Sequence, residues 1–170
     1  LGQTRIRFFG PASFTKKTAK HIRTIILPVV DSILSKIGIQ SPGFDIGISN
    51  IGAASSNDVA VDISGYSADL SVFLSLLSAG TDIPVKNNLV FTGHIAGTDG
   101  NIRMVSGIPE KAEAVIHETD TDTLVYPDLG GDLSMAALFP EETERIEGAL
   151  AQAKGRIHLA AVGDVGDLVK

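Results

Sequence analysis

Ser67 lies where the sequence predicts that a strand ends and a helix begins, a position suited to a nucleophile. Residues 59–63 alternate apolar and polar side chains, as a strand does, and after residues 64–66 the apolar-rich stretch 67–79 follows. A hydroxyl at such a chain reversal can be reached by a substrate. The unpaired N–H groups of the first helical turn and the positive end of the helix dipole favour a developing oxyanion. The alternative is that Ser67 is a helix N-cap, a common role of serine.

Lys111 is the residue whose chemistry would complement a serine nucleophile. It lies in the first or second turn of a helix that Pro109 opens, where the positive end of the dipole disfavours an ammonium. Burial against apolar side chains of its own helix would lower its pKa further, and a neutral lysine can act as a general base. The alternative is a solvated lysine paired with Glu110 or Glu113, since buried lysines are rare.

The histidines give little support to another chemistry. They are far apart in the sequence and show no H-E-x-x-H or similar metal-ligand spacing, so no metal site is predicted. We interpret all four as surface or capping residues: His21, His94, His117 and His158. Ser67 does not lie in a G-x-S-x-G motif, but a serine–histidine hydrolase stays open as an alternative, because catalytic triads occur in several chain orders.

Composition narrows the class of protein. The length of 170 residues suits one domain with one core, and a formal net charge of −6 disfavours nucleic-acid binding. The absence of cysteine excludes disulfides, cysteine-ligated zinc and a cysteine nucleophile, and it fits a reducing compartment, so we expect a cytoplasmic location. No apolar run reaches membrane-span length, and no P-loop motif is present. Because the chain lacks an initiator Met, we interpret residues 1–170 as a single domain from a longer chain.

Helical and strand patterns interleave along the chain, which predicts an α/β, mixed α+β, fold. Helix-spaced isoleucines predict one long helix over residues 14–37, bent at Pro28. Residues 67–79 are apolar on most sides, which predicts a central, buried helix. Further strands are expected at 4–9, 44–49, 89–93, 102–104, 123–126 and 157–161, and further helices from 109, at 141–154 and at 162–170.

Two stretches resemble the motifs of the Lon protease family. Residues 64–69 read Ser-Gly-Tyr-Ser-Ala-Asp where the family has a D-G-[PD]-S-A-[GS] turn with the nucleophilic serine. Residues 106–111 read Ser-Gly-Ile-Pro-Glu-Lys where the family has a G-G-x-x-x-K segment with the lysine. Between them, residues 82–85 stand in place of a G-x-P-V step, and residues 92–94, Thr-Gly-His, in place of a T-G-E-like strand end. The resemblance covers nearly the whole chain in order.

In the serine and lysine motifs, four positions depart from the family pattern, which makes the chain resemble a divergent Lon-like member: Ser64, Tyr66, Asp69 and Ser106. The changes leave the serine and the lysine in place. Asp69 would bring a carboxylate near the nucleophile, where we expect it to raise the pKa of Lys111 and slow the enzyme at neutral pH.

The resemblance implies a fold, an activity and a set of roles. It implies a Lon peptidase domain-like fold, with small mixed sheets and helices packed against them. It also implies a serine endopeptidase that hydrolyses unfolded or polyprotein substrates. Ser67 would be the nucleophile and Lys111 the base, with Thr92 orienting the lysine and with Ala68 and Gly65 in supporting positions. This chemistry needs no metal or organic cofactor.

The family also implies partners. Its members assemble into homo-oligomeric rings, often hexamers, and in ATP-dependent proteolysis an AAA+ ATPase module in another segment or subunit uses the ATP. Viral relatives process their own polyproteins without an ATPase. The alternative function is a catalytically silent Lon-like domain that serves as an oligomerisation platform for an ATPase. The altered turn favours this alternative, whereas the retained Ser67 and Lys111 argue against it.

Overall fold

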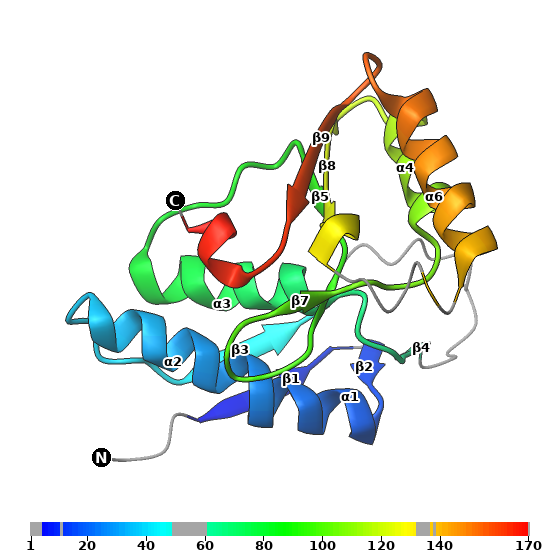
Figure 1. The fold of residues 1–170 in the computed structure, drawn as a ribbon. Coiled ribbons are helices and arrows are strands. Elements are labelled where there is room, and N and C mark those ends of the chain that lie inside the picture. The colour runs from blue at the N-terminus through cyan, green and yellow to red at the C-terminus, as the bar shows by residue number, and fades with distance from the viewer. Residues whose placement is uncertain (1–4, 11, 49–60, 132–136, 138, 170) are drawn as a thin grey trace.

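The computed structural model describes residues 5–10, 12–48, 61–131, 137 and 139–169. Helices and strands interleave along these ranges, which confirms the predicted mixed α/β class (Figure 1). The first half contains β1 (Ile6–Phe9), β2 (Ala12–Phe14), α1 (Lys16–His21), η1 (Ile22–Ile26), α2 (Leu27–Lys36), β3 (Phe44–Gly47), β4 (Val61–Ile63) and α3 (Asp69–Thr81). The second half contains β5 (Leu89–Phe91), β6 (His94–Ile95), β7 (Ile102–Arg103), α4 (Ile108–His117), β8 (Thr123–Pro127), η2 (Leu129–Gly131), α6 (Pro140–Ala153), β9 (His158–Val162) and η3 (Val165–Leu168).

The long amino-terminal helix is present over residues 16–36, but its pitch changes in the middle. Between α1 and α2, the segment η1 is a π-helical turn. Pro28 lies in the first turn of α2 and has no N–H to donate. Directly before it, the N–H of Leu27 donates to the carbonyl oxygen of Ile22, five residues upstream. The irregularity predicted at Pro28 is therefore a π-turn just ahead of the proline.

A parallel sheet of β5, β8 and β9 lies between two apolar clusters. Leu124 of β8 packs in the cluster with α4 and α6, and the next residue, Val125, packs in the cluster with α2 and α3. Successive residues of a strand point to opposite faces of a sheet, so β8 contributes to both clusters. Figure 1 shows α4 and α6 on one side of this sheet and α3 on the other.

Helix α3 has one buried face rather than being buried all round. Leu70, Val72, Phe73 and Leu76 are buried, whereas Ser75 is exposed. The prediction of a central helix is thus correct for its apolar stripe, and the exposed side of the helix is left to line a groove described below. None of the helices in the described residues combines the length and apolar character that crossing a membrane requires.

The connection between β5 and β8 sets the position of α4. The two strands are neighbours and run parallel, and the chain between them forms the antiparallel hairpin of β6 and β7 and then α4. A helix that connects parallel strands runs back across the sheet. Helix α4 therefore begins at the edge of the sheet where β5 ends (Figure 1).

Candidate functional site

The turn before α3 is held on its amino-terminal side by β2 and α1. The N–H of Thr15 donates to the carbonyl oxygen of Ile63 at 3.0 Å, where β2 and β4 pair. The hydroxyl of Thr18 donates to the carbonyl oxygen of Gly65 at 3.3 Å. Gly65 has φ +85°, a left-handed conformation that glycine adopts without steric conflict. The predicted supporting role of Gly65 thus acquires a physical reason, because a side chain there would strain the turn.

Ser67 is joined through its backbone to the end of β5. Its carbonyl oxygen accepts the Gly93 N–H at 3.3 Å and the Thr92 hydroxyl at 3.5 Å, and Ala68 forms a β-bridge with Gly93. Thr92 has no exposed surface, and its own N–H donates to the carbonyl oxygen of Val125 at 3.0 Å. The family resemblance implies that Thr92 orients the lysine. Within the described residues, its hydroxyl instead donates to the backbone of the serine.

Ser67 is not a helix cap. The N-cap position of α3 is Ala68, and the Asp69 N–H is bonded to the carbonyl oxygen of Tyr66 at 3.1 Å. The capping alternative for Ser67 is therefore wrong. Its side chain is half-buried, and in the part of the chain that the structure describes its hydroxyl makes no hydrogen bond.

Lys111 lies near the start of α4, and its amine folds back toward the helix N-terminus. Gly107 is the N-cap, with φ +74°, and Lys111 Nζ donates to the carbonyl oxygen of Ser106 at 3.0 Å. Burial lowers the pKa of Lys111 from its ordinary value, and the charge of Glu110 opposes this by raising it. No salt bridge joins the amine to a glutamate in the described ranges. The ion pair with Glu110 or Glu113 is therefore not formed in these ranges, and the lysine side chain is only part-buried.

Glu110 is directed to a different partner. Its Oε1 accepts from Arg145 Nη1 at 3.0 Å, and Arg145 also donates to Glu142. A backbone hydrogen bond and the Arg145 guanidinium hold the pKa of Glu110 below its ordinary value. Glu110 is therefore a carboxylate near Lys111 that stays ionised.

Ser67 and Lys111 lie toward the same edge of the parallel sheet without bonding to each other. Ser67 is joined to the end of β5, and α4 begins at that edge. No hydrogen bond connects their side chains in the described segments, and the lysine amine is bonded to Ser106 instead. The structure thus joins the backbone of Ser67 and Ala68 to Gly93 and to the Thr92 hydroxyl. It leaves the lysine amine bonded to Ser106, the residue before the N-cap of α4.

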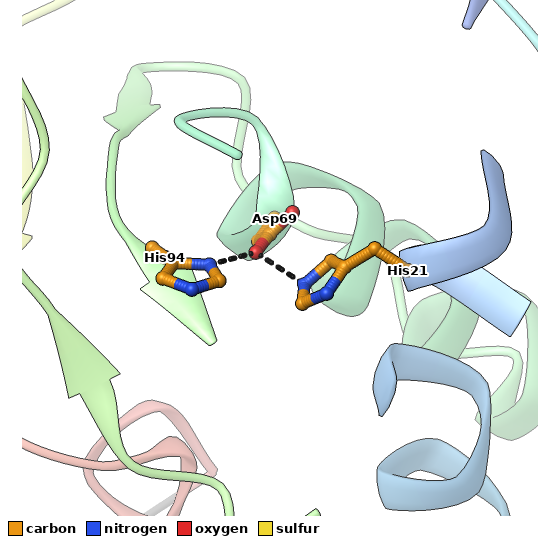
Figure 2. A group of neighbouring side chains, drawn as sticks. All are labelled: His21, Asp69 and His94. Atoms are coloured by element: carbon orange, nitrogen blue, oxygen red, sulfur yellow. Dashed lines mark hydrogen bonds and ion pairs between the residues drawn. The ribbon is translucent and has the colours of Figure 1, made fainter. Parts of the chain in front are cut away.

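Asp69 binds two histidines that the sequence did not place together (Figure 2). Its Oδ2 lies 2.9 Å from His21 Nε2 and 2.9 Å from His94 Nδ1, and it accepts the Ile95 N–H at 3.0 Å. The side chain of Asp69 is 2% exposed, whereas those of His21 and His94 are 10% and 23% exposed. His21 is the last residue of α1, Asp69 is the first residue of α3, and His94 is the first residue of β6. We call them the His–Asp–His cluster.

Tyr66 covers one side of the His–Asp–His cluster. Its ring stacks on His94, with centroids 4.6 Å apart and an interplanar angle of 21°, and its centroid lies 4.4 Å from that of His21. Lys17 Nζ lies 5.6 Å from the Tyr66 ring centroid. The aromatic contacts hold both imidazoles against the turn that carries Ser67.

Two expectations about these residues are corrected. His21 and His94 were interpreted as surface or capping residues, but both are part-buried and bonded to one carboxylate. Asp69 was expected to raise the pKa of Lys111, but its carboxylate faces the histidines, and the carboxylate that raises the lysine pKa is that of Glu110. A signal was present in the sequence, since Asp69 and His94 both stand where the resembled motifs carry other residues.

An apolar groove of about 460 Å³ lies beside Ala68. Its walls are the exposed side of α3, including Ser71 and Ser75, the end of β4 at Ile63, and β3 with the residue after it. Small side chains on the helix leave this space open, so the side chain of a bound polypeptide could occupy it next to the serine.

Comparisons with known proteins supply no family for this chain. A scan against protein-family models found no match, and a search of curated proteins found no significant one.

Proposed function

We propose that this chain is the proteolytic domain of a divergent Lon-like serine endopeptidase, with Ser67 as the nucleophile and Lys111 as the general base. The single observation that carries this proposal is a half-buried lysine of lowered pKa at the start of α4, on the edge of the sheet to which the serine turn is bonded. The serine hydroxyl has no structural partner among the described residues, and this also favours a chemical role.

The proposed reaction is acyl transfer. Neutral Lys111 takes the hydroxyl proton of Ser67 as the Ser67 oxygen attacks the scissile carbonyl carbon. The lysine then gives that proton to the leaving amine, and water hydrolyses the acyl-enzyme. The four-carbon side chain of Lys111 must first release the Ser106 carbonyl oxygen and turn toward Ser67. Catalytic hydrogen bonds are often absent before substrate binds, so this rearrangement is compatible with the proposal.

The developing oxyanion needs donors at the serine turn. The start of α3 supplies the positive end of a helix dipole there, and backbone N–H groups around Ala68 are the candidates for stabilising the oxyanion. The backbone bonds of Ser67 to Thr92 and Gly93 fix the position of this turn, so the donors need little reorganisation during the reaction.

The substrate and the assembly follow from the same proposal. The groove beside Ala68 suits an apolar side chain of an extended polypeptide, as in an unfolded protein or a polyprotein. We further propose a homo-oligomeric ring and, for ATP-dependent proteolysis, an AAA+ ATPase module outside this domain. The absence of cysteine fits a cytoplasmic location for this activity.

The direct test is cleavage of an unfolded protein and of a short fluorogenic peptide, the latter because it needs no unfolding. The wild type, Ser67→Ala and Lys111→Ala are compared, with Ser64→Ala, an exposed serine of the same turn, and Lys86→Ala, an exposed lysine, as matched controls. We expect both dyad variants to lose cleavage and both controls to retain it.

Other outcomes would overturn the proposal in distinguishable ways. Cleavage that survives in Lys111→Ala but is lost in His94→Ala would identify a histidine as the base, an arrangement that the His94–Asp69 hydrogen bond makes worth testing. A wild-type chain that cleaves neither substrate would favour the oligomerisation platform.

A further inference from the structure

Three side chains of the types that bind transition metals meet at the start of α3. The His–Asp–His cluster offers two imidazole nitrogens and a carboxylate oxygen, and these atoms all lie within 4.8 Å of one another. We infer that the cluster is a binding site for one divalent transition-metal ion of the zinc type. The inference does not depend on Ser67 or Lys111, so it stands or falls apart from the peptidase proposal.

The donor set favours a transition metal over a hard cation. Imidazole suits zinc, cobalt and nickel, and two histidines with one carboxylate form a familiar three-ligand zinc set that leaves one coordination position open. Calcium and magnesium prefer oxygen ligands, of which this cluster supplies one carboxylate. His21 would bind through Nε2 and His94 through Nδ1, since these are the nitrogens directed at Asp69 (Figure 2).

The present geometry is close to what an ion requires. Zinc–ligand bonds of about 2.0–2.1 Å in a tetrahedron place neighbouring donor atoms roughly 3.3 Å apart. The two nitrogen–oxygen separations of 2.9 Å must therefore open by a few tenths of an ångström. Side-chain rotations achieve such a change without moving the backbone elements.

The surroundings of the cluster also resemble those of a metal site. The Ile95 N–H donates to Asp69 Oδ2 and orients the carboxylate, as outer-shell donors do for metal ligands. The Tyr66 ring restricts the orientation of both imidazoles. A carboxylate only accepts, so each imidazole nitrogen that faces Asp69 donates an N–H to it. A bound ion would take the place of these two protons and coordinate the same nitrogens.

A bound ion would connect three elements beside the serine turn. The cluster joins α1, α3 and β6, and Asp69 is two residues from Ser67. An ion that binds the folded chain and not the unfolded one raises the stability of the fold. We therefore expect zinc to raise the melting temperature of this domain whether or not the domain cleaves peptides.

The test uses the whole chain freed of metal with a chelator that is then removed. Zinc binding is measured by calorimetry, and cobalt binding by the visible absorption of tetrahedral Co²⁺. His21→Gln and His94→Gln each remove one ligand, and His117→Gln and His158→Gln are matched controls because these histidines are exposed and outside the cluster. We expect one equivalent of zinc to bind the wild type and both controls, and affinity to fall by about 100-fold or more in either cluster variant.

Several results would overturn the inference. A wild type that binds no zinc at micromolar concentrations would do so, as would binding that survives in both cluster variants, because the ion would then be held elsewhere on the surface. Tight binding of magnesium in place of zinc would refute the assignment of the site to a transition metal. Circular dichroism of each metal-free variant verifies folding, and Asp69 is left unchanged because its removal is expected to weaken the fold itself.

Discussion

Replacing Asp69 with alanine removes one carboxylate that accepts three hydrogen bonds, and the expected loss of stability can be worked from the burial of each donor. The N–H of Ile95, a residue with no exposed surface, would be left unpaired at a cost of about 1–3 kcal/mol. The imidazoles of His21 and His94 are partly exposed, so water can replace the carboxylate in part, and each bond contributes about 0.5–1.5 kcal/mol.

The midpoints of these ranges sum to about 4 kcal/mol. For a domain of this size, each kcal/mol lowers the melting temperature by about 2–4 °C, so we expect a fall of roughly 8–16 °C in Asp69→Ala. Differential scanning calorimetry in the presence of a chelator measures this without any contribution from metal binding.

The matched control is Asp45→Ala. Asp45 accepts two shorter hydrogen bonds from Arg7, at 2.7 and 2.6 Å, but both side chains are at least half exposed. An exposed ion pair adds little to stability, so Asp45→Ala should melt close to the wild type. Equal falls in melting temperature in the two variants would refute this explanation, because we expect the burial of the carboxylate, and not its number of hydrogen bonds, to decide the loss of stability.

Three further predictions concern the serine turn, the lysine and the groove. Glu110→Gln removes a charge that raises the pKa of Lys111, so the neutral amine forms at lower pH. The acid limb of the kcat/KM profile should therefore move to lower pH, and a shift to higher pH would contradict the assigned cause. Gly93→Ala places a Cβ 2.9 Å from a neighbouring side chain and should destabilise the fold by about 1–3 kcal/mol and reduce cleavage. Gly148→Ala, with open space at its Cβ in α6, should instead stabilise by about 0.5–1 kcal/mol, and urea unfolding of both variants checks the contrast. Ser71→Phe fills the groove and should raise the KM for peptides with little change in melting temperature, whereas an unchanged KM would show that peptides bind elsewhere.

Hydrophobic periodicity predicted most helices and strands because it is a local property of the chain. The helix of residues 16–36 follows from isoleucines at helical spacing, and its irregularity follows from Pro28, which lacks an N–H. The extent of burial of α3 could not be predicted in the same way. Its apolar residues occur on several sides, and only the arrangement of β3 and β4 decides that Ser75 faces a groove rather than another element.

The His–Asp–His cluster could not be predicted from sequence patterns. Its members are distant in the chain and have no ligand spacing, and they meet because α1 packs beside the turn and β6 follows β5 at the same edge. Ser67 and Thr92 were singled out from their motifs, and the structure joins them by a hydrogen bond, but the partner of the Thr92 hydroxyl was not predictable. Whether its hydroxyl donates to a lysine or to a backbone carbonyl depends on tertiary geometry that the motif does not encode.

The two residues of the proposed dyad are held by different numbers of hydrogen bonds, and this difference determines which of them can move when substrate binds. The serine turn has three sets of bonds: Thr18 to Gly65, the Thr92 and Gly93 donors to Ser67, and the histidines to the buried carboxylate after it. The lysine amine has one, to the carbonyl oxygen of Ser106, just before its own helix. A substrate that adjusts this site should therefore move the lysine rather than the serine, since the single local bond opposes motion least. Hydrogen exchange should accordingly show slow exchange at the Gly93 N–H, and faster exchange there than at the start of α4 would refute this division between a fixed nucleophile and an adjustable base.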